Sequence, residues 1–370
     1  MTMRADKVRV PFRRPFVTAQ GMWQVREAWI IRLTDADGRT GVGEAVLEPA
    51  DGETASTVLD HLVHDVGLFV RDGQPPTAEE LELHGSPGRA LRAAIDSARF
   101  DLDGHPSSRI LPGGDGVGVN ATIAFMGPDA SAEAARQALH AGYRTLKLKA
   151  GAERETEVLV ERLRAVRAAV GPEVHLRVDA NGAWDLETAT DRLDAIGRFA
   201  LEYVEQPLAG DDTAELAELR RRVRVPIAAD ETVTSLRTAR ELLDADAVDV
   251  LVVKPVRVGG PGPAAAIAAL AAERGVPVVV STLFETGVGL AAALAIAAVL
   301  PEVPGSRLGH LPDHGLATAG VLIHDLLVDA LVVEDGRMWT PDEPADGGLG
   351  IALDERALAR FLVESGGAPE

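Results

Sequence analysis

The feature that most constrains the fold is a regular alternation of strand-like and helical runs that begins near residue 118. Short apolar runs alternate with Ala-, Arg- and Glu-rich runs of helical spacing. The strand-like runs read GVNATIAF, RTLKLKA, VHLRVDA, LEYVEQP, VPIAADE, VDVLVVKP and VPVVVST, with a weak eighth near SRLGHL. Eight strands alternating with helices over about 200 residues predict a closed parallel β/α barrel. A doubly wound open sheet is the alternative, but no G-x-G-x-x-G pattern follows the first strand.

The first 115 or so residues lack this alternation, and their pattern predicts an α+β segment. Residues 25–47 contain two extended runs around DADG, which is a hairpin signal, and residues 90–104 have the Ala, Ile and Phe spacing of a helix. The Gly-rich stretch 112–118 fits no phosphate-loop pattern and no lysine directly follows it, so we interpret it as a linker rather than a phosphate cradle.

Composition narrows the classes of function. The chain has 370 residues, 46% of them hydrophobic, and 57 acidic against 37 basic residues give a net charge of −20, which argues against nucleic-acid and anionic-membrane partners. It contains no cysteine, which excludes disulfides, zinc–thiolate sites and cysteine nucleophiles. The N-terminal residues lack the apolar core of a signal peptide, and GVGLAAALAIAAVL is shorter than a membrane span. We expect a soluble, cytoplasmic protein.

Carboxylates close three successive strand-like runs. Asp179, Glu205 and Asp230 end the third, fourth and fifth runs at spacings of 26 and 25 residues. The carboxyl ends of parallel barrel strands meet at one face, so these side chains are expected to lie side by side at the barrel mouth. Three oxygen ligands without softer donors suit Mg²⁺. The alternative, three unrelated turn carboxylates, requires the same position to recur by chance on three strands.

Lysines lie on the strands flanking these carboxylates. Lys147 and Lys149 point to the same side of the second run, and metal-bound carboxylates would pair with them inside the barrel. Lys254 ends the sixth run, four strands further on, and therefore lies across the mouth from Lys149; taken alone it would be interpreted as a surface lysine. An ammonium near a dication and a second ammonium loses its proton more easily. The arrangement predicts abstraction of a proton next to a carboxylate, with Lys149 as the base.

The sequence resembles a known family. The motifs TLKLKAG, RVDANGAWD, YVEQPL, IAADET and VVKPVRVGG, in this order, are similar to those of the enolase superfamily, muconate-cycloisomerase subgroup, over essentially the whole chain. The resemblance implies an α+β capping domain with a mobile substrate loop over 1–115, a modified β/α barrel over 116–325, and a C-terminal segment over 326–370 that returns to the capping domain. It implies Mg²⁺, or alternatively Mn²⁺, on the three carboxylates, and Lys149 and Lys254 on opposite faces of the substrate. Lys147, Asn181 and Glu231 would support them.

Further segments resemble one group within this subgroup. Residues 11–33 are similar to the capping loop and hairpin of o-succinylbenzoate synthases and their N-succinylamino-acid racemase relatives. Residues 281–301 and 314–327 resemble the seventh-strand and C-terminal segments of that group. Arg257 would either tune Lys254 or begin the following loop. The residues assigned to substrate binding on this basis are Thr18, Trp23, Arg257, Ser281, Thr282 and Glu285.

The resemblance implies a carbon–oxygen lyase that dehydrates its substrate to o-succinylbenzoate in menaquinone biosynthesis. The alternative is an N-succinylamino-acid racemase or a related epimerase or cycloisomerase. Dipeptide epimerases of the subgroup carry a D-x-D pair at the eighth strand, where this chain reads SRLGHLPD. A non-catalytic barrel is a third hypothesis, but such a chain should have lost a ligand or a lysine. We expect a small carboxylate substrate, no nucleic-acid or membrane partner, and a homo-oligomer.

Overall fold

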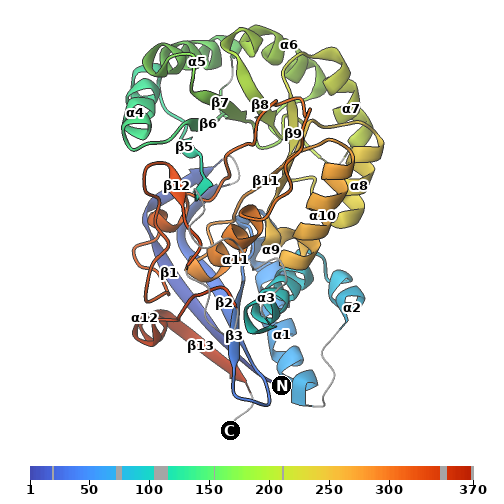
Figure 1. Cartoon of the computed structure of the whole chain (residues 1–370), viewed down its shortest axis with the longest axis vertical. Helices are drawn as coiled ribbons and strands as arrows, with labels where there is room; N and C mark the ends of the chain where they lie inside the picture. The colour runs from blue at the N-terminus through green and yellow to red at the C-terminus, as the bar shows by residue number, and fades with distance from the viewer. Residues whose placement is uncertain are drawn as a thin grey trace.

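The computed structural model describes residues 1–18, 21–71, 77–103, 116–153, 155–210, 212–341 and 348–367. Its two principal parts are an antiparallel sheet with helices, drawn at the bottom of Figure 1, and a curled parallel sheet ringed by helices at the top. Each part has a hydrophobic core of its own, although residues of β1 and β2 contribute to both cores.

The N-terminal sheet has the strand order β13-β1-β2-β3. Its strands are β1 (Thr2–Thr18), β2 (Gly21–Thr34), β3 (Thr40–Ala45) and β13 (Leu362–Gly367). The predicted hairpin around DADG is confirmed by the pairing of β2 with β3. The Asp35 carboxylate accepts hydrogen bonds from the backbone N–H groups of Asp37 and Arg39, so local contacts fix this turn.

Three helices pack near this sheet: α1 (Gly52–Arg71), α2 (Ala78–Glu82) and α3 (Gly85–Asp103). The helix predicted from the spacing of residues 90–104 is therefore present and begins earlier. It lies directly on β3, where a Cβ at Gly43 would stand 1.9 Å from the carbonyl oxygen of Ala94. A glycine is needed there because any side chain would separate the helix from the sheet.

The parallel sheet has seven strands in the order β11-β10-β9-β8-β7-β6-β5. They are β5 (Ala121–Ile123), β6 (Thr145–Lys149), β7 (His175–Asp179), β8 (Leu201–Glu205), β9 (Ile227–Ala229), β10 (Val250–Val253) and β11 (Val278–Val280). All seven coincide with predicted runs. Buried Val, Leu and Ala residues dominate them, as expected for strands covered on both faces.

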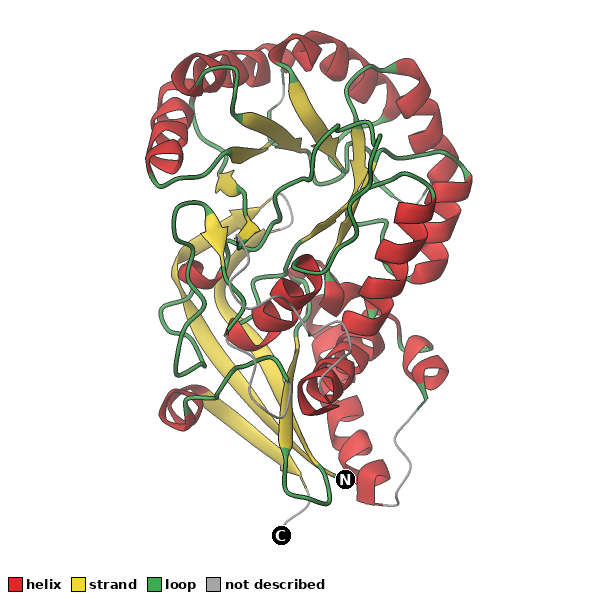
Figure 2. Ribbon diagram, viewed as in Figure 1, coloured by secondary structure: helices red, strands yellow, loops and turns green. Residues whose placement is uncertain are grey.

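Helices cover the outside of this sheet, as Figure 2 shows. They are α4 (Pro128–His140), α5 (Thr156–Val170), α6 (Leu186–Ile196), α7 (Thr213–Arg222), α8 (Leu236–Asp244), α9 (Pro255–Val258), α10 (Pro261–Glu273) and α11 (Gly287–Ala297). The described residues also include the short 3₁₀ helices η1 (Pro49–Asp51), η3 (Gly197–Phe199) and η4 (Ala319–Val321). Of the barrel helices, α8 and α9 were not among the predicted runs.

The eighth strand expected near residues 306–311 does not form there. Gly305 and Gly309 adopt φ values of 78° and 74°, so this segment turns rather than extends. His314 and Gly315 instead close the gap between β5 and β11. Their backbone bonds run from Asn120 N–H to His314 O, from His314 N–H to Gly118 O, and from Gly315 N–H to Val280 O. The barrel is therefore closed by isolated bridges in place of an eighth strand.

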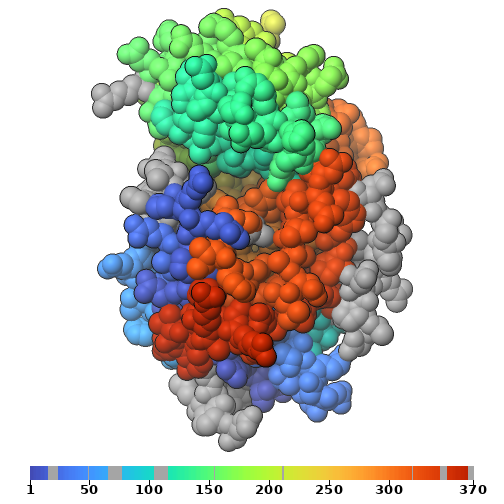
Figure 3. All heavy atoms as spheres, turned by 90° about the vertical axis from the view of Figure 1, so that its left-hand side faces the viewer, coloured from blue at the N-terminus to red at the C-terminus, as the bar shows by residue number. Residues whose placement is uncertain are grey.

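After the barrel the chain returns to the N-terminal sheet. Strand β12 (Arg337–Met338) pairs with β4 (Val117–Gly118), and α12 (Glu355–Phe361) leads into β13, which pairs with β1. In Figure 3 this C-terminal segment, in orange and red, lies beside the blue N-terminal strands. The domain boundaries at residues 115 and 325 stay predictions, and most of the predicted linker 112–118 lies outside the described residues. Within the described ranges, no helix has the length and apolar character that a membrane crossing requires.

Candidate functional site

The three strand-end carboxylates lie together at the mouth of the barrel. Asp179 and Glu205 are paired across β7 and β8, and Asp230 follows β9. All three are buried, with at most 1% of each residue exposed. Carboxylates are rarely buried without a partner cation, so their neighbours decide what the site can do.

Two lysines of β6 meet the first two carboxylates. The Nζ atom of Lys147 lies 2.9 Å from Glu205 Oε1 and 3.0 Å from Asp179 Oδ2. Lys149 Nζ lies 2.6 Å from the same Asp179 oxygen and donates a second hydrogen bond to Asn181 Oδ1 at 2.9 Å. Both lysines therefore point into the mouth, as the alternation of side chains along a strand requires.

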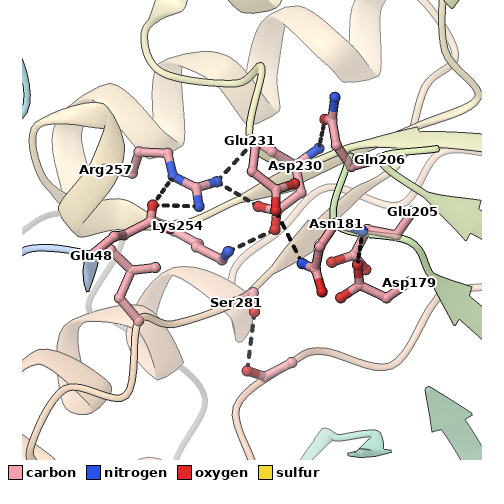
Figure 4. Close-up of polar contacts among 12 residues, drawn as sticks. Glu48, Asp179, Asn181, Glu205, Gln206, Asp230, Glu231, Lys254, Arg257 and Ser281 are labelled. Carbon is pink, nitrogen blue, oxygen red and sulfur yellow. Dashed lines mark hydrogen bonds and ion pairs between the residues drawn. The ribbon is translucent and has the colours of Figure 1, made fainter. Parts of the chain in front are cut away.

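Two further basic residues, Lys254 and Arg257, contact the third carboxylate, Asp230. Lys254, directly after β10, donates a hydrogen bond to Asp230 Oδ2 at 2.6 Å. Arg257 is also buried, and donates to Asp230 Oδ1 at 2.6 Å and to Glu48 Oε1 at 2.6 Å (Figure 4). Of the two alternatives for Arg257, this geometry favours an influence on Lys254, because both cations share the Asp230 carboxylate.

Asn181 and Glu231 connect the residues around Asp179 with those around Asp230. The Asn181 side-chain N–H donates to Glu231 Oε1 at 3.0 Å, and the two side chains face each other in Figure 4. Within the described part of the chain, Glu231 Oε2 is buried without a hydrogen-bond partner. An unpaired carboxylate oxygen beside three other acidic groups leaves a place for a further cation.

The charges shift the ionisation of the buried groups. Burial, together with Asp179 and Asp230, raises the pKa of Glu205 to about 7. Burial alone would lower the pKa of Lys147, but the attraction of Asp179 and Glu205 raises it well above its usual range. Burial opposes ionisation of Asp179 too, yet the two β6 lysines hold its pKa below the usual range. The mouth therefore carries closely spaced charges of both signs.

The residues assigned to substrate binding fall into two groups. Ser281, Thr282 and Glu285 are buried in the loop that follows β11, where Ser281 Oγ lies 3.4 Å from the Gly315 carbonyl oxygen. The Glu285 carboxylate accepts from the Leu283 N–H of its own loop. The backbone of Thr18 and Trp23 belongs to β1 and β2, but their side chains lie outside what the structure describes. Their substrate contacts stay predictions.

Sequence reasoning missed two residues that hold this site together. Gln206, directly after Glu205, adopts a φ of 37° and accepts from the Asp230 N–H at 3.0 Å. Glu48 lies in the loop after β3 and reaches Arg257 across 209 positions of sequence. Gln206 is part of the YVEQPL motif, so the motif could have identified it as a site residue. Nothing in the sequence connects Glu48 to Arg257.

A second group of donor atoms lies near the opposite ends of the strands. Among the described residues, ligand atoms of His175, Glu202 and His310 all lie within 4.8 Å of one another. The two imidazole rings are stacked, with centroids 4.2 Å apart and an interplanar angle of 20°. Each imidazole lone pair lies in the plane of its own ring, and the two planes are nearly parallel, so one ion between the rings cannot lie in both planes. Arg177 already donates to the Glu202 carboxylate, so we assign no metal here.

His310 instead makes a pH-dependent contact. Its Nδ1 lies 2.8 Å from Leu308 O and its Nε2 lies 2.7 Å from Glu202 Oε1, so the protonated ring donates to both. The hydrogen bond to Glu202 raises the pKa of His310, whereas burial lowers the pKa of neighbouring His175. A raised folded-state pKa gives a stabilisation that is complete below the unfolded pKa and lost as the pH rises through the folded value.

We therefore expect His310→Gln to destabilise the protein at pH 5.5 and to have little effect at pH 8.5. The difference in unfolding free energy should stay below about 1 kcal/mol because the ring is partly exposed. Urea unfolding of both proteins at the two pH values measures it, with exposed His140→Gln as the control. A loss that is equal at both pH values would contradict the assignment of this contact.

Comparison with known proteins identifies the family. Residues 130–357 match the family model described as enolase C-terminal domain-like. The chain belongs to the enolase superfamily. The predicted fold class, a modified β/α barrel with an N-terminal α+β part, is confirmed by a superfamily structure, the muconate lactonizing enzyme from Pseudomonas fluorescens complexed with muconolactone. That structure has a TM-score of 0.82 and 26% identity, with 98% of each chain covered.

Curated members of the enolase superfamily with named activities are also similar. An o-succinylbenzoate synthase from Thermobifida fusca is 46% identical over 223 residues, which cover 60% of this chain and 66% of that protein. Another, from Geobacillus stearothermophilus, is 32% identical over 96% of this chain and 93% of its own length. An N-succinylamino acid racemase from Thermus thermophilus is 31% identical over 95% of both proteins.

Proposed function

We propose that this protein removes a proton α to a carboxylate with the help of a divalent cation, and that its main reaction is dehydration to o-succinylbenzoate. The observation that carries the proposal is the placement of Lys149 and Lys254 on opposite sides of one buried carboxylate cluster. Two amines facing each other across a carboxylate-lined mouth suit proton transfer at a carbon held between them. The similarity to two o-succinylbenzoate synthases favours the specific reaction.

The donor set fits Mg²⁺, with Mn²⁺ as the alternative. Asp179, Glu205 and Asp230 offer only hard oxygen ligands, and the unpartnered Glu231 oxygen adds negative charge beside them. Mg²⁺ takes octahedrally arranged oxygen ligands at about 2.1 Å and usually keeps several waters, so water or substrate oxygens would complete its ligand set. The cation would neutralise the substrate carboxylate and the negative charge that grows on it as the α-proton leaves.

The protein's own groups then have distinct tasks. Lys149 takes the α-proton and afterwards returns it to the departing hydroxide, so that one molecule of water leaves the substrate. Lys254 remains protonated and stabilises the negative charge from the opposite face. Lys147, bonded to both Asp179 and Glu205, holds these carboxylates in place. Asn181 orients Lys149 through its side-chain oxygen.

Racemisation of N-succinylamino acids is the second candidate. Lys254 is bonded to a carboxylate in the same way as Lys149, at the same 2.6 Å separation, so it is equally placed to carry a proton. The similarity to an N-succinylamino acid racemase supports this reading. Dipeptide epimerisation is less favoured, because SRLGHLPD lacks the D-x-D pair. The small carboxylate substrate, the homo-oligomer and the cytoplasmic location stay predictions.

The deciding experiment compares two substrates. We expect turnover of the cyclohexadiene precursor of o-succinylbenzoate to exceed α-proton exchange of N-succinylamino acids in D₂O, both with added Mg²⁺. Faster reaction of the N-succinylamino acids would make racemisation the main activity and leave the lysine assignments intact. No exchange or turnover with either substrate would overturn the proposal and favour a non-catalytic barrel.

A further inference from the structure

The loop between β11 and α11 borders the mouth beside Lys254. Its first residue, Ser281, donates a backbone hydrogen bond to the carbonyl oxygen of Val253, the residue directly before Lys254. In β/α barrels, substrate contacts come from loops at this end of the strands. Phe284 adopts a φ of 62°, so the loop turns sharply and depends on its surroundings to keep its shape.

One arginine of the N-terminal sheet contacts this loop. Arg26 of β2 is buried, and its guanidinium donates to the carbonyl oxygens of Leu283 and Phe284. It also donates to the carbonyl oxygen of Leu47, in the loop after β3, at 2.7 Å. The planar guanidinium thus joins backbone carbonyls from both parts of the protein, which lysine with its single ammonium cannot reproduce.

One glutamate of the same sheet contacts the start of the following helix. Glu44 of β3 is buried and accepts from the Thr286 N–H at 2.9 Å, the Thr286 hydroxyl at 2.7 Å and the Gly289 N–H at 2.9 Å. These donors belong to the first turn of α11, an 11-residue helix, where a carboxylate satisfies otherwise unpaired N–H groups and complements the helix dipole.

The packing around Glu44 leaves no room for a side chain at Gly289. A Cβ at Gly289 would lie 2.7 Å from Glu285 and 3.1 Å from Glu44 Oε2. The sheet therefore presents a cation to the loop carbonyls and an anion to the helix N–H groups. Each charge matches the polarity of the backbone groups that it meets.

We propose that Arg26 and Glu44 are positioning residues through which the N-terminal sheet sets the geometry of the 281–286 loop and so the affinity for substrate. This inference rests on the proposed function, because it concerns the same mouth. The hydrogen bonds described above for Lys149, Lys254 and Asp230 go to residues other than Arg26 and Glu44. Loss of either positioning residue should therefore weaken substrate binding far more than the chemical step.

The test combines kinetics with backbone hydrogen exchange of Arg26→Gln and Glu44→Gln. We expect KM for the better of the two substrate classes to rise about tenfold, while kcat falls by less than about threefold, as when a supporting contact and not a reacting group is lost. Amide exchange of residues 283–289 should accelerate in the same variants. Arg26→Lys should behave like Arg26→Gln, because the geometry of the guanidinium is required and not its charge alone.

Two matched controls lie on the same hairpin. Arg39→Gln removes a guanidinium that pairs with Asp35 in the turn, and Glu27→Gln removes a partly exposed carboxylate of β2. Both should leave KM and exchange in 283–289 unchanged. Unaltered kinetics in the Arg26 and Glu44 variants would overturn the inference, as would a fall in kcat that merely follows a general loss of thermal stability. Thr286→Val, which removes one hydroxyl donor to Glu44, gives the same test with a smaller rise in KM if the other variants fail to fold.

Failure of the inference is separable from failure of the proposed function. If the wild-type protein turns over neither substrate, the proposed function fails, and binding of o-succinylbenzoate replaces KM as the measure of affinity. An unchanged Kd in both variants would then overturn the role of Arg26 and Glu44. A raised Kd together with faster exchange in 283–289 would support it.

Discussion

Asp179→Asn, Glu205→Gln and Asp230→Asn are each expected to lower kcat/KM by about a thousandfold or more. Each change removes one negative oxygen donor from the proposed cation site, and a catalytic cation supplies several kcal/mol of transition-state stabilisation, with about 1.4 kcal/mol per factor of ten. The changes are nearly isosteric, so the barrel should persist. Asp179→Asn should also lower stability, because a broken buried ion pair costs about 3–5 kcal/mol and Asp179 is shared by Lys147 and Lys149.

Steady-state kinetics with and without a chelator measure this effect, and circular dichroism verifies that each variant is folded at the assay temperature. Glu187→Gln is the matched control, since its carboxylate is exposed on α6 and pairs with Arg222. Full activity of the chelator-treated wild-type protein would refute the metal assignment. Retained activity in any one variant would remove that residue from the ligand set.

The second large effect concerns the two lysines across the mouth. Lys149→Ala is expected to remove turnover completely in a synthase, because Lys149 performs both proton transfers. Lys254→Arg should retain a measurable fraction of dehydration, because a positive charge is what that position supplies. In a racemase Lys254 must itself carry a proton, and an arginine with a pKa above 12 is a poor carrier, so racemisation should fall by about 10²–10⁴-fold.

The measurement is a comparison of both reactions in the same Lys254→Arg protein. Residual dehydration with little racemisation is the expected outcome. Equal loss of both reactions would show that Lys254 transfers a proton in dehydration as well, provided that the variant still binds substrate with wild-type affinity. Lys254→Ala serves as the reference for loss of both charge and proton transfer.

The positions of the mouth residues could be predicted because they depend on a periodic pattern. Once the strands are identified, parallel pairing places Lys149, Asp179 and Glu205 on adjacent strands at one level, which the register confirms. The alternation of side chains puts Lys147 on the same side as Lys149. These predictions need only local sequence and the geometry of a parallel sheet.

Other features could not be predicted because they depend on contacts between distant segments. The expected eighth strand near 306–311 was wrong, since the chain turns at Gly305 and Gly309 and the closing bridges come from residues 314 and 315. Arg26, Glu44 and Glu48 meet the barrel through partners more than 200 residues away. No sequence signal marks these three charged residues, because each is an ordinary residue within or beside a strand.

The position of Lys147 bears on whether the protein needs a metal in order to fold. Its ammonium lies between Asp179 and Glu205, and the other two mouth lysines each neutralise a carboxylate as well. The lysine side chains therefore neutralise charge of the acidic cluster as soon as the strands pair. In zinc fingers the metal supplies the folding free energy and the apoprotein is unfolded. Here lysine side chains supply the counter-charges, so we expect the barrel to fold without the cation and to bind it afterwards.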